Sequence, residues 1–132
     1  SRQFSIFELT KELSVKNSAK ALRIAAYIGS AAKFAMPAAV SALYTHFYRI
    51  LKYGALLMSD PRPGNDKKAK VLGVNPYFFQ EYDTAVRNYP VKKAMAVVAL
   101  LKEYDYKGKG GDVGEATPAE LMVELTARIL NI

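Results

Sequence analysis

Residues 74–110, VNPYFFQEYDTAVRNYPVKKAMAVVALLKEYDYKGKG, predict two helices joined by a very short corner. Asn75 is suited to cap the first helix, and Pro76 follows at the first helical position, where a missing N–H is harmless. The inner face of this helix is predicted from spacing to hold Phe78, Tyr82, Ala85, Val86 and Tyr89. Pro90 then restarts a helix, because the residue before a proline avoids the α region. The inner face of the second helix is predicted to hold Val91, Ala94, Met95, Val98, Leu101 and Tyr104.

Two helices are predicted near the N-terminus. Ser5 and Glu8 have the spacing of a capping box, which opens a short helix with an inner side of Ile6, Leu9 and Leu13. Asn17 or Ser18 caps a second helix over residues 18–28, and Gly29 is expected to end it. The predicted inner face of the second helix is Leu22, Ala25 and Ala26, with Ile28 beside them.

The longest and most apolar predicted helix covers about residues 37–58. One stripe at helical spacing consists of Val40, Leu43, Phe47, Ile50, Leu51, Leu57 and Met58. A second stripe consists of Tyr44, Tyr48 and Ala55. A helix that is apolar on most of its circumference is either central in its domain or covered by another protein. We favour the central position and keep the covered position as the alternative.

Turn-forming residues separate the remaining helices. Residues 60–66 predict a loop, Asp66 is expected to cap a short helix over 67–72, and residues 107–111 predict a flexible connection. Thr117 and Glu120 form a second capping box, which opens a final helix to about residue 131. This helix is predicted to pair Glu124 with Arg128 and to bury Leu121, Met122, Leu125 and Ile129.

Together these elements predict an all-α fold, a single bundle of six or seven helices over residues 1–132. No stretch alternates apolar and polar residues in the rhythm of a half-buried strand. With 132 residues, 51% of them hydrophobic, the chain is large and apolar enough for one globular domain. The absence of cysteine excludes disulfides and thiolate metal sites, and it fits a cytoplasmic location. Arg49 and Lys52 interrupt the best candidate for a membrane span.

No constellation of reactive side chains in the sequence indicates an enzyme, so we predict no catalytic, cofactor-binding or metal-binding residues and no cofactor. His46 is the only histidine and has no carboxylate one helical turn away, so it suits a hydrogen bond within the bundle better than a metal. The carboxylates of the two EYD triplets, 81–83 and 103–105, lie on different helix faces and are expected to be exposed. The glycines around Lys109 lack the preceding strand and following serine or threonine of a phosphate-binding loop.

The net charge of +7 permits a nucleic-acid partner or an acidic protein partner. Basic residues concentrate at 62–70 and 102–109. A solvated surface is the default interpretation for most of them, and contact with a nucleic-acid backbone is the alternative. Tyr77, at a helix N-terminus, and Tyr106, beside the glycine-rich segment, are candidates to stack on unpaired bases if they are exposed. Plain packing is the favoured role for both tyrosines.

The order and spacing of several motifs resemble one known family. A leucine–glycine–proline–aromatic helix start, an arginine–tyrosine pair and a leucine–glutamate–aspartate helix end are followed by a polar loop and a last amphipathic helix. These residues are Leu72, Gly73, Pro76, Tyr77, Arg87, Tyr89, Leu101, Glu103 and Asp105. The pattern resembles the C-terminal region of the delta subunit of the bacterial DNA polymerase III clamp loader, in a Bacteroidetes-like form. Residues 4–13 are similar to the opening of that region, so the resemblance extends over the whole chain.

The resemblance implies a collar domain, one of the helical domains that join the five subunits of a clamp loader. In that family the delta subunit opens the sliding clamp during DNA replication and does not itself hydrolyse ATP, within a holoenzyme that is a DNA-directed DNA polymerase. The chain begins at Ser1 and not at methionine, so we expect a C-terminal fragment without the AAA+-like N-terminal modules. The implied partners are collar domains of the gamma/tau and delta-prime type and primed DNA within the complex, with no membrane.

On this interpretation the chain holds the clamp-opening subunit in the ring. The candidate DNA contacts are Tyr77, Tyr106, Lys107 and Lys109. The candidate subunit contacts are Tyr44, Tyr48 and Met122. A stand-alone helical nucleic-acid-binding module is the alternative function, and a small helical enzyme is a residual hypothesis.

Overall fold

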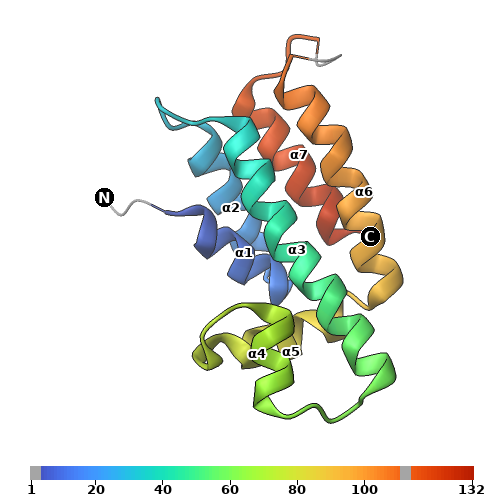
Figure 1. Ribbon diagram of the computed structural model, residues 1–132. Coiled ribbons are helices and arrows are strands. Elements are labelled where there is room, and N and C mark those ends of the chain that lie inside the picture. The colour runs from blue at the N-terminus through green and yellow to red at the C-terminus, as the bar shows by residue number, and fades with distance from the viewer. Residues whose placement is uncertain (1–3, 111–113) are drawn as a thin grey trace.

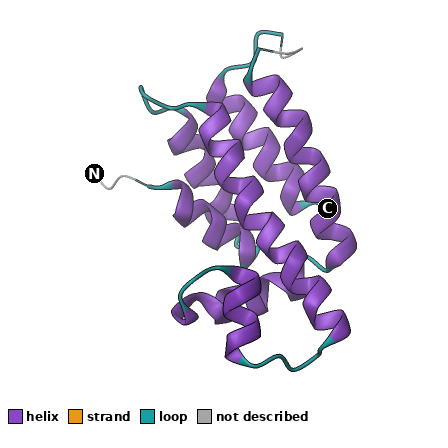
Figure 2. Cartoon of the chain, viewed as in Figure 1, coloured by secondary structure: helices purple, strands orange, loops and turns teal. Residues whose placement is uncertain are grey.

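The computed structural model describes residues 4–110 and 114–132. Over these residues the chain forms seven α-helices and one 3₁₀ turn, and no residue lies in a strand (Figure 2). The elements are α1 (Ile6–Ser14), α2 (Ser18–Gly29), α3 (Met36–Ser59), α4 (Asn65–Leu72), η1 (Pro76–Phe78), α5 (Phe79–Asn88), α6 (Val91–Gly108) and α7 (Pro118–Leu130). The predicted all-α bundle of six or seven helices is confirmed.

The long helix α3 runs through the molecule, and the other helices are arranged around it (Figure 1). α6 packs along α3, and α7 packs along α2. α1 contacts α2, α3 and α5, while α4 and α5 gather at the C-terminal end of α3. The buried face of α3 holds Val40, Leu43, Phe47 and Ile50, as predicted, together with His46 and Tyr53. α3 is therefore buried on one side only, and the choice between a central position and one covered by a partner stays open.

Local capping signals placed most helix starts correctly. Both capping boxes form, since the hydroxyls of Ser5 and Thr117 accept from the backbone N–H of the glutamate three residues later. The side chain of Asn17 caps α2 by accepting from the N–H of Lys20. The prediction for Asp66 is wrong, because α4 begins at Asn65 with Gly64 as its N-cap and without a capping side chain.

The corner that follows α4 begins with a 3₁₀ turn, which changes the phase of the next helix. The Asn75 carboxamide accepts from the Tyr77 N–H at 2.9 Å, so Asn75 does cap this segment. However, Pro76–Phe78 is a 3₁₀ turn, with three residues per turn, and α5 begins only at Phe79. As a result Phe79 is buried in place of Phe78.

Two helices rich in alanine expose part of the face that was predicted to be buried. In α6 the core-facing residues are Ala94, Val97, Leu100, Leu101 and Tyr104, whereas Met95 is 56% exposed. In α2 the core-facing residues are Ala21, Ile24 and Ala25, with Leu22 and Ala26 only half-buried. Alanine is compatible with either environment, so spacing alone does not define the inner face.

Gly29 ends α2, as predicted, but it does not adopt the left-handed conformation in which a glycine often terminates a helix. It is the last residue of the helix and is buried against the start of α7. A Cβ atom added to Gly29 would lie 2.6 Å from the Cα of Ala119, so a side chain has no room there. The glycine therefore allows the backbones of α2 and α7 to approach closely.

The connection after α6 begins later than predicted. α6 continues through Gly108, so Lys107 is helical and not part of a flexible segment. Gly110 has a φ of +92°, a conformation that glycine adopts readily. The predicted connection also included Gly111, which lies outside the described residues.

Candidate interaction surfaces

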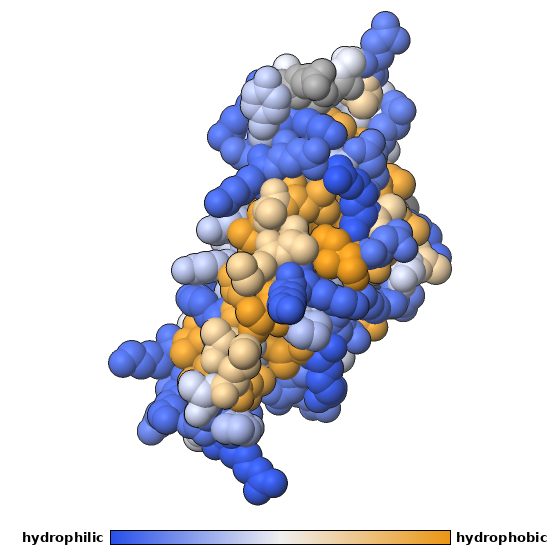
Figure 3. All heavy atoms as spheres, turned by 90° about the vertical axis from the view of Figure 1, so that its right-hand side faces the viewer, coloured by the Kyte–Doolittle hydropathy of each residue, from blue (hydrophilic) through white to orange (hydrophobic). Residues whose placement is uncertain are grey.

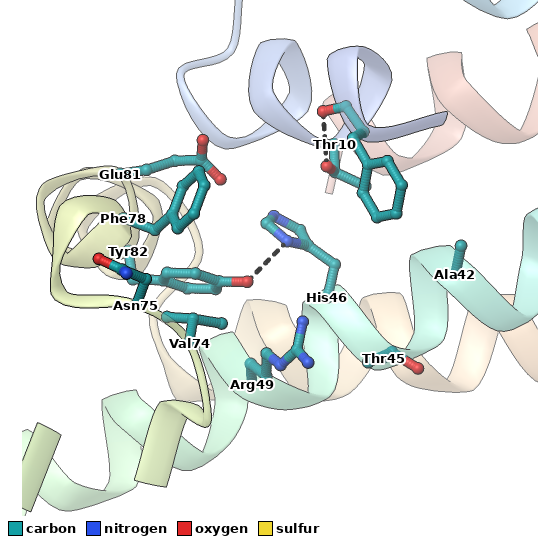
Figure 4. A pocket seen from close by; sticks show the side chains of 11 residues that line it. Thr10, Ala42, Thr45, His46, Arg49, Val74, Asn75, Phe78, Glu81 and Tyr82 are labelled. Atoms are coloured by element: carbon teal, nitrogen blue, oxygen red, sulfur yellow. Dashed lines mark hydrogen bonds between the residues drawn. The ribbon is translucent and has the colours of Figure 1, made fainter. Parts of the chain in front are cut away.

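A cleft of about 540 Å³ opens between α1, α3 and the segment from Val74 into α5 (Figure 4). We call it the His46 cleft. α3 contributes His46 and Arg49, and α1 contributes Phe7 and Thr10. The opposite wall is formed by Val74, Asn75, Phe78, Glu81 and Tyr82.

A chain of hydrogen bonds holds the His46 side chain in this cleft. The Ser14 hydroxyl donates to the Thr10 carbonyl at 2.8 Å and lies 2.6 Å from His46 Nε2. Because its proton is engaged, Ser14 Oγ accepts from Nε2, which leaves Nδ1 to accept from the Tyr82 hydroxyl at 3.2 Å. Both ring nitrogens are thus satisfied, and the predicted role of His46 as a hydrogen-bonded histidine in the bundle is confirmed.

His46 stays neutral at physiological pH. Burial, together with a smaller contribution from the nearby charge of Arg49, lowers the pKa of His46 from 6.5 to about 3. A neutral imidazole whose two nitrogens are both occupied has no lone pair left for a metal. No group of three or more potential metal ligands occurs in the described part of the chain.

Arg49 supplies the positive charge of the cleft. Its guanidinium points between Tyr82 and His46 (Figure 4). Burial raises the pKa of the Tyr82 hydroxyl, and Arg49 partly opposes this shift. None of the ion pairs among residues 4–110 and 114–132 includes Arg49. The cleft therefore contains a cation without a carboxylate partner.

The carboxylates of the EYD triplets are engaged individually and do not form an acid–base pair. Asp83 accepts from the Tyr53 hydroxyl, which links α5 to α3. Burial raises the pKa of Glu81, which is half-buried and not exposed as expected. Glu103 bonds Arg128 at 2.9 Å, while Glu124 accepts from the Tyr104 hydroxyl. The predicted Glu124–Arg128 pair is thus replaced by contacts from α7 to α6.

The four candidate DNA contacts do not form one site. Tyr77 is 83% exposed and lies on η1, which precedes α5. Tyr106, Lys107 and Lys109 lie at the C-terminal end of α6, a helix of 18 residues that is about 27 Å long at 1.5 Å per residue. Lys109 pairs with Asp105 at 2.9 Å, and Lys107 lies over the Tyr104 ring. A nucleic acid would have to extend from η1 to the C-terminal end of α6 to touch all four residues.

The three candidate subunit contacts differ in accessibility. Tyr44 and Tyr48 are partly exposed and stack with ring centroids 5.7 Å apart, so both are available to a partner. Met122 has no exposed surface, because it lies in the core with Leu121 and Leu125. The prediction for Met122 is corrected accordingly, since a fully buried side chain cannot form a subunit contact while this fold persists.

The tyrosine pair belongs to an exposed apolar surface that extends onto α6. On α3 the exposed and half-exposed side follows helical spacing through Tyr44, Tyr48, Leu51, Ala55 and Met58. On α6 the corresponding residues are Val91, Met95 and Val98. Met58 is 76% exposed and shares a shallow groove with Val91. Figure 3 shows apolar side chains gathered in a band on the α6 side of the molecule. We call these eight residues the α3–α6 face.

Sequence reasoning missed the residues that make the His46 cleft a candidate site. Phe7 lies off the inner stripe of α1 and is exposed in the structure. The signal in the sequence was a large apolar residue outside that stripe. From the sequence, Arg49 could be recognised only as a charged residue that interrupts an apolar helix. Its position opposite Phe78 depends on contacts between segments distant in sequence, and spacing along one helix does not report these.

Comparisons with known protein families, with curated proteins and with solved structures found no match to this chain. Within the described residues, no helix combines the length and the apolar character needed to cross a membrane.

Proposed function

We propose that this chain is an assembly module, the collar domain of a delta-type subunit of the DNA polymerase III clamp loader. Its role is to hold the clamp-opening subunit in the pentameric complex through helix–helix contacts. The motif resemblance over residues 72–109 supports the family. The exposed α3–α6 face is the single observation that carries the assembly role.

The α3–α6 face has the character of a surface that another protein covers. Methionine, tyrosine and valine side chains line two neighbouring helices, and exposed apolar patches on soluble proteins often mark interaction sites. Full burial of a methionine or valine side chain contributes about 1.5–3 kcal/mol. Flexible methionines also adapt to an irregular partner surface. Collar domains of the gamma/tau and delta-prime type are the partners that the family resemblance implies.

The Met95→Asp substitution is expected to weaken association with these partner collar domains at least about tenfold, or roughly 1.4 kcal/mol. The physical reason is that a charge placed in a buried apolar contact loses its hydration. Titrating partner collar domains against the immobilised chain measures the change. Val15→Asp is the matched control, because Val15 is also an exposed apolar residue but lies at the C-terminal end of α1. Equal affinity of the Met95→Asp and Val15→Asp variants would contradict the assignment of this face.

A stand-alone nucleic-acid-binding module is the second candidate, and the exposure of Tyr77 favours it. On the collar proposal, the isolated chain binds primed DNA weakly at both about 50 mM and about 200 mM salt, because few phosphates are neutralised. On the alternative, binding is tight at low salt and falls steeply, and Tyr77→Ala removes about 1–3 kcal/mol of stacking. Fluorescence anisotropy with a labelled primer–template separates the two. Tyr27→Ala serves as the control, since Tyr27 is a partly exposed tyrosine on α2.

A further inference from the structure

We propose that the His46 cleft binds a peptide segment in which an aromatic or aliphatic side chain stands next to a carboxylate. This site is separate from the α3–α6 face and does not depend on the proposed function. His46 and Arg49 lie on the side of α3 that faces α1 and α5, away from the stripe through Tyr44 and Tyr48.

The apolar part of the cleft suits one or two side chains. A volume of about 540 Å³ lies within the usual range of ligand pockets, about 300–1,000 Å³. Phe7 is 76% exposed and Phe78 is 45% exposed, and they lie on opposite walls. An apolar side chain inserted between them would cover both phenylalanines.

Arg49 provides the anchor for the carboxylate. It is half-buried beside neutral groups, and no carboxylate pairs with it among the described residues. A guanidinium has five N–H donors in a fixed fork and binds a carboxylate through two parallel hydrogen bonds. Partial burial strengthens such a pair relative to one on the open surface.

Several polar groups of the cleft are already engaged, and Arg49 is the one cation among its lining residues. Both nitrogens of His46 are occupied, and the Thr10 hydroxyl donates to the Phe7 carbonyl at 2.9 Å. The Asn75 carboxamide accepts from the Tyr77 N–H. Glu81 carries the opposing charge at the rim, and the nearby Lys11 and Glu12 shift its pKa in opposite directions. The cleft therefore matches a ligand with one carboxylate.

A peptide fits this chemistry better than a nucleic acid does. A nucleic-acid strand presents a phosphate at every nucleotide, so several cations would be needed along its path. The cleft is lined by one cation, Arg49, which can neutralise a single negative group. A peptide can present a single carboxylate beside an apolar side chain.

The test is an NMR titration of the ¹⁵N-labelled 132-residue chain with the peptide acetyl-Gly-Phe-Asp-Leu-Gly-amide. Shifts are expected at α1, the middle of α3 and the η1 segment. The counterpart with Asn in place of Asp keeps the shape but not the charge, and should bind at least tenfold more weakly. In Arg49→Gln the two peptides should bind with equal, reduced affinity. Arg62→Gln, in the exposed loop before α4, is the matched control and should bind as wild type does.

Phe78→Ser provides an independent check, because Phe78 is largely outside the core and its loss should weaken both peptides without unfolding the chain. The proposal is overturned if no cleft resonance shifts at about 5 mM peptide, well above a millimolar dissociation constant. It is also overturned if wild type and Arg49→Gln bind the Asp peptide equally. Cleft shifts with oligothymidylate but not with the peptide would assign the site to nucleic acid instead.

Discussion

Replacing Gly29 with alanine is expected to lower the free energy of unfolding by about 2 kcal/mol, within the usual range for overpacking. In an open helix the same change would stabilise, because glycine is about 1 kcal/mol less favourable than alanine. Here the new Cβ would lie 2.6 Å from the Cα of Ala119 and 3.1 Å from the Pro118 carbonyl oxygen. These are backbone atoms at the start of a capped helix and cannot rotate away. The clash is therefore relieved only if α2 and α7 move apart.

Gly54→Ala is the matched control for this prediction. Gly54 is also buried within a helix that faces a neighbour, but its added Cβ would meet a side-chain methyl group of Val91 at 3.1 Å. A methyl group can shift by a few tenths of an ångström, so the variant should differ from wild type by less than about 1 kcal/mol. Urea denaturation of both variants measures the difference. Equal stability of Gly29→Ala and Gly54→Ala would show that backbone proximity does not control the α2–α7 contact.

Features encoded within a few residues could be predicted from the sequence. Capping boxes at Ser5 and Thr117, the Asn17 cap and the Pro90 break each depend on one or two neighbouring residues. The helices they delimit therefore lie close to their predicted positions. The prediction for His46 is confirmed for a similar reason, because a lone histidine without nearby carboxylates has few alternatives to a hydrogen bond.

The orientation of the helices was less predictable, because it depends on partners distant in sequence. α6 carries alanine or valine on several sides, so its buried face is decided by where α3 and α7 lie. The 3₁₀ turn at Pro76–Phe78 adds a second difficulty, since it changes which phenylalanine points inward. The ambiguous pattern of α6 explains why Met95 is predicted in the core, although it lies on the exposed α3–α6 face.

The His46 cleft could not have been assembled from the sequence. Phe7, Arg49 and Phe78 are separated by tens of residues, and their proximity requires α1 and α5 to pack against α3. The same packing creates the largest pKa shift associated with the cleft, that of His46. Because the buried imidazole of His46 resists protonation, the free energy of unfolding depends on pH, and this dependence can be measured without any ligand.

Between pH 7 and pH 4.5 the chain is expected to lose about 2–3 kcal/mol of stability through His46 alone. The folded-state pKa is about 3 and the unfolded-state pKa is 6.5. As the pH falls below 6.5, the unfolded chain gains a proton that the folded chain does not accept, so unfolding becomes more favourable. The loss continues until the pH approaches 3. Arg49 contributes in the same direction, because its charge opposes a second cation beside it.

His46→Gln isolates this contribution from that of the carboxylates, which titrate over part of the same range. The variant should be less stable than wild type at pH 7 by about 1–3 kcal/mol, because a hydrogen-bonding partner of Ser14 or Tyr82 is lost. Glutamine does not titrate, so between pH 7 and pH 4.5 the stability difference should shift by about 2–3 kcal/mol in favour of the variant. Urea denaturation at pH 7, 5.5 and 4.5 measures this difference. Parallel pH profiles would mean that the imidazole accepts a proton in the folded state, through an opening that lets water reach the ring between Ser14 and Tyr82.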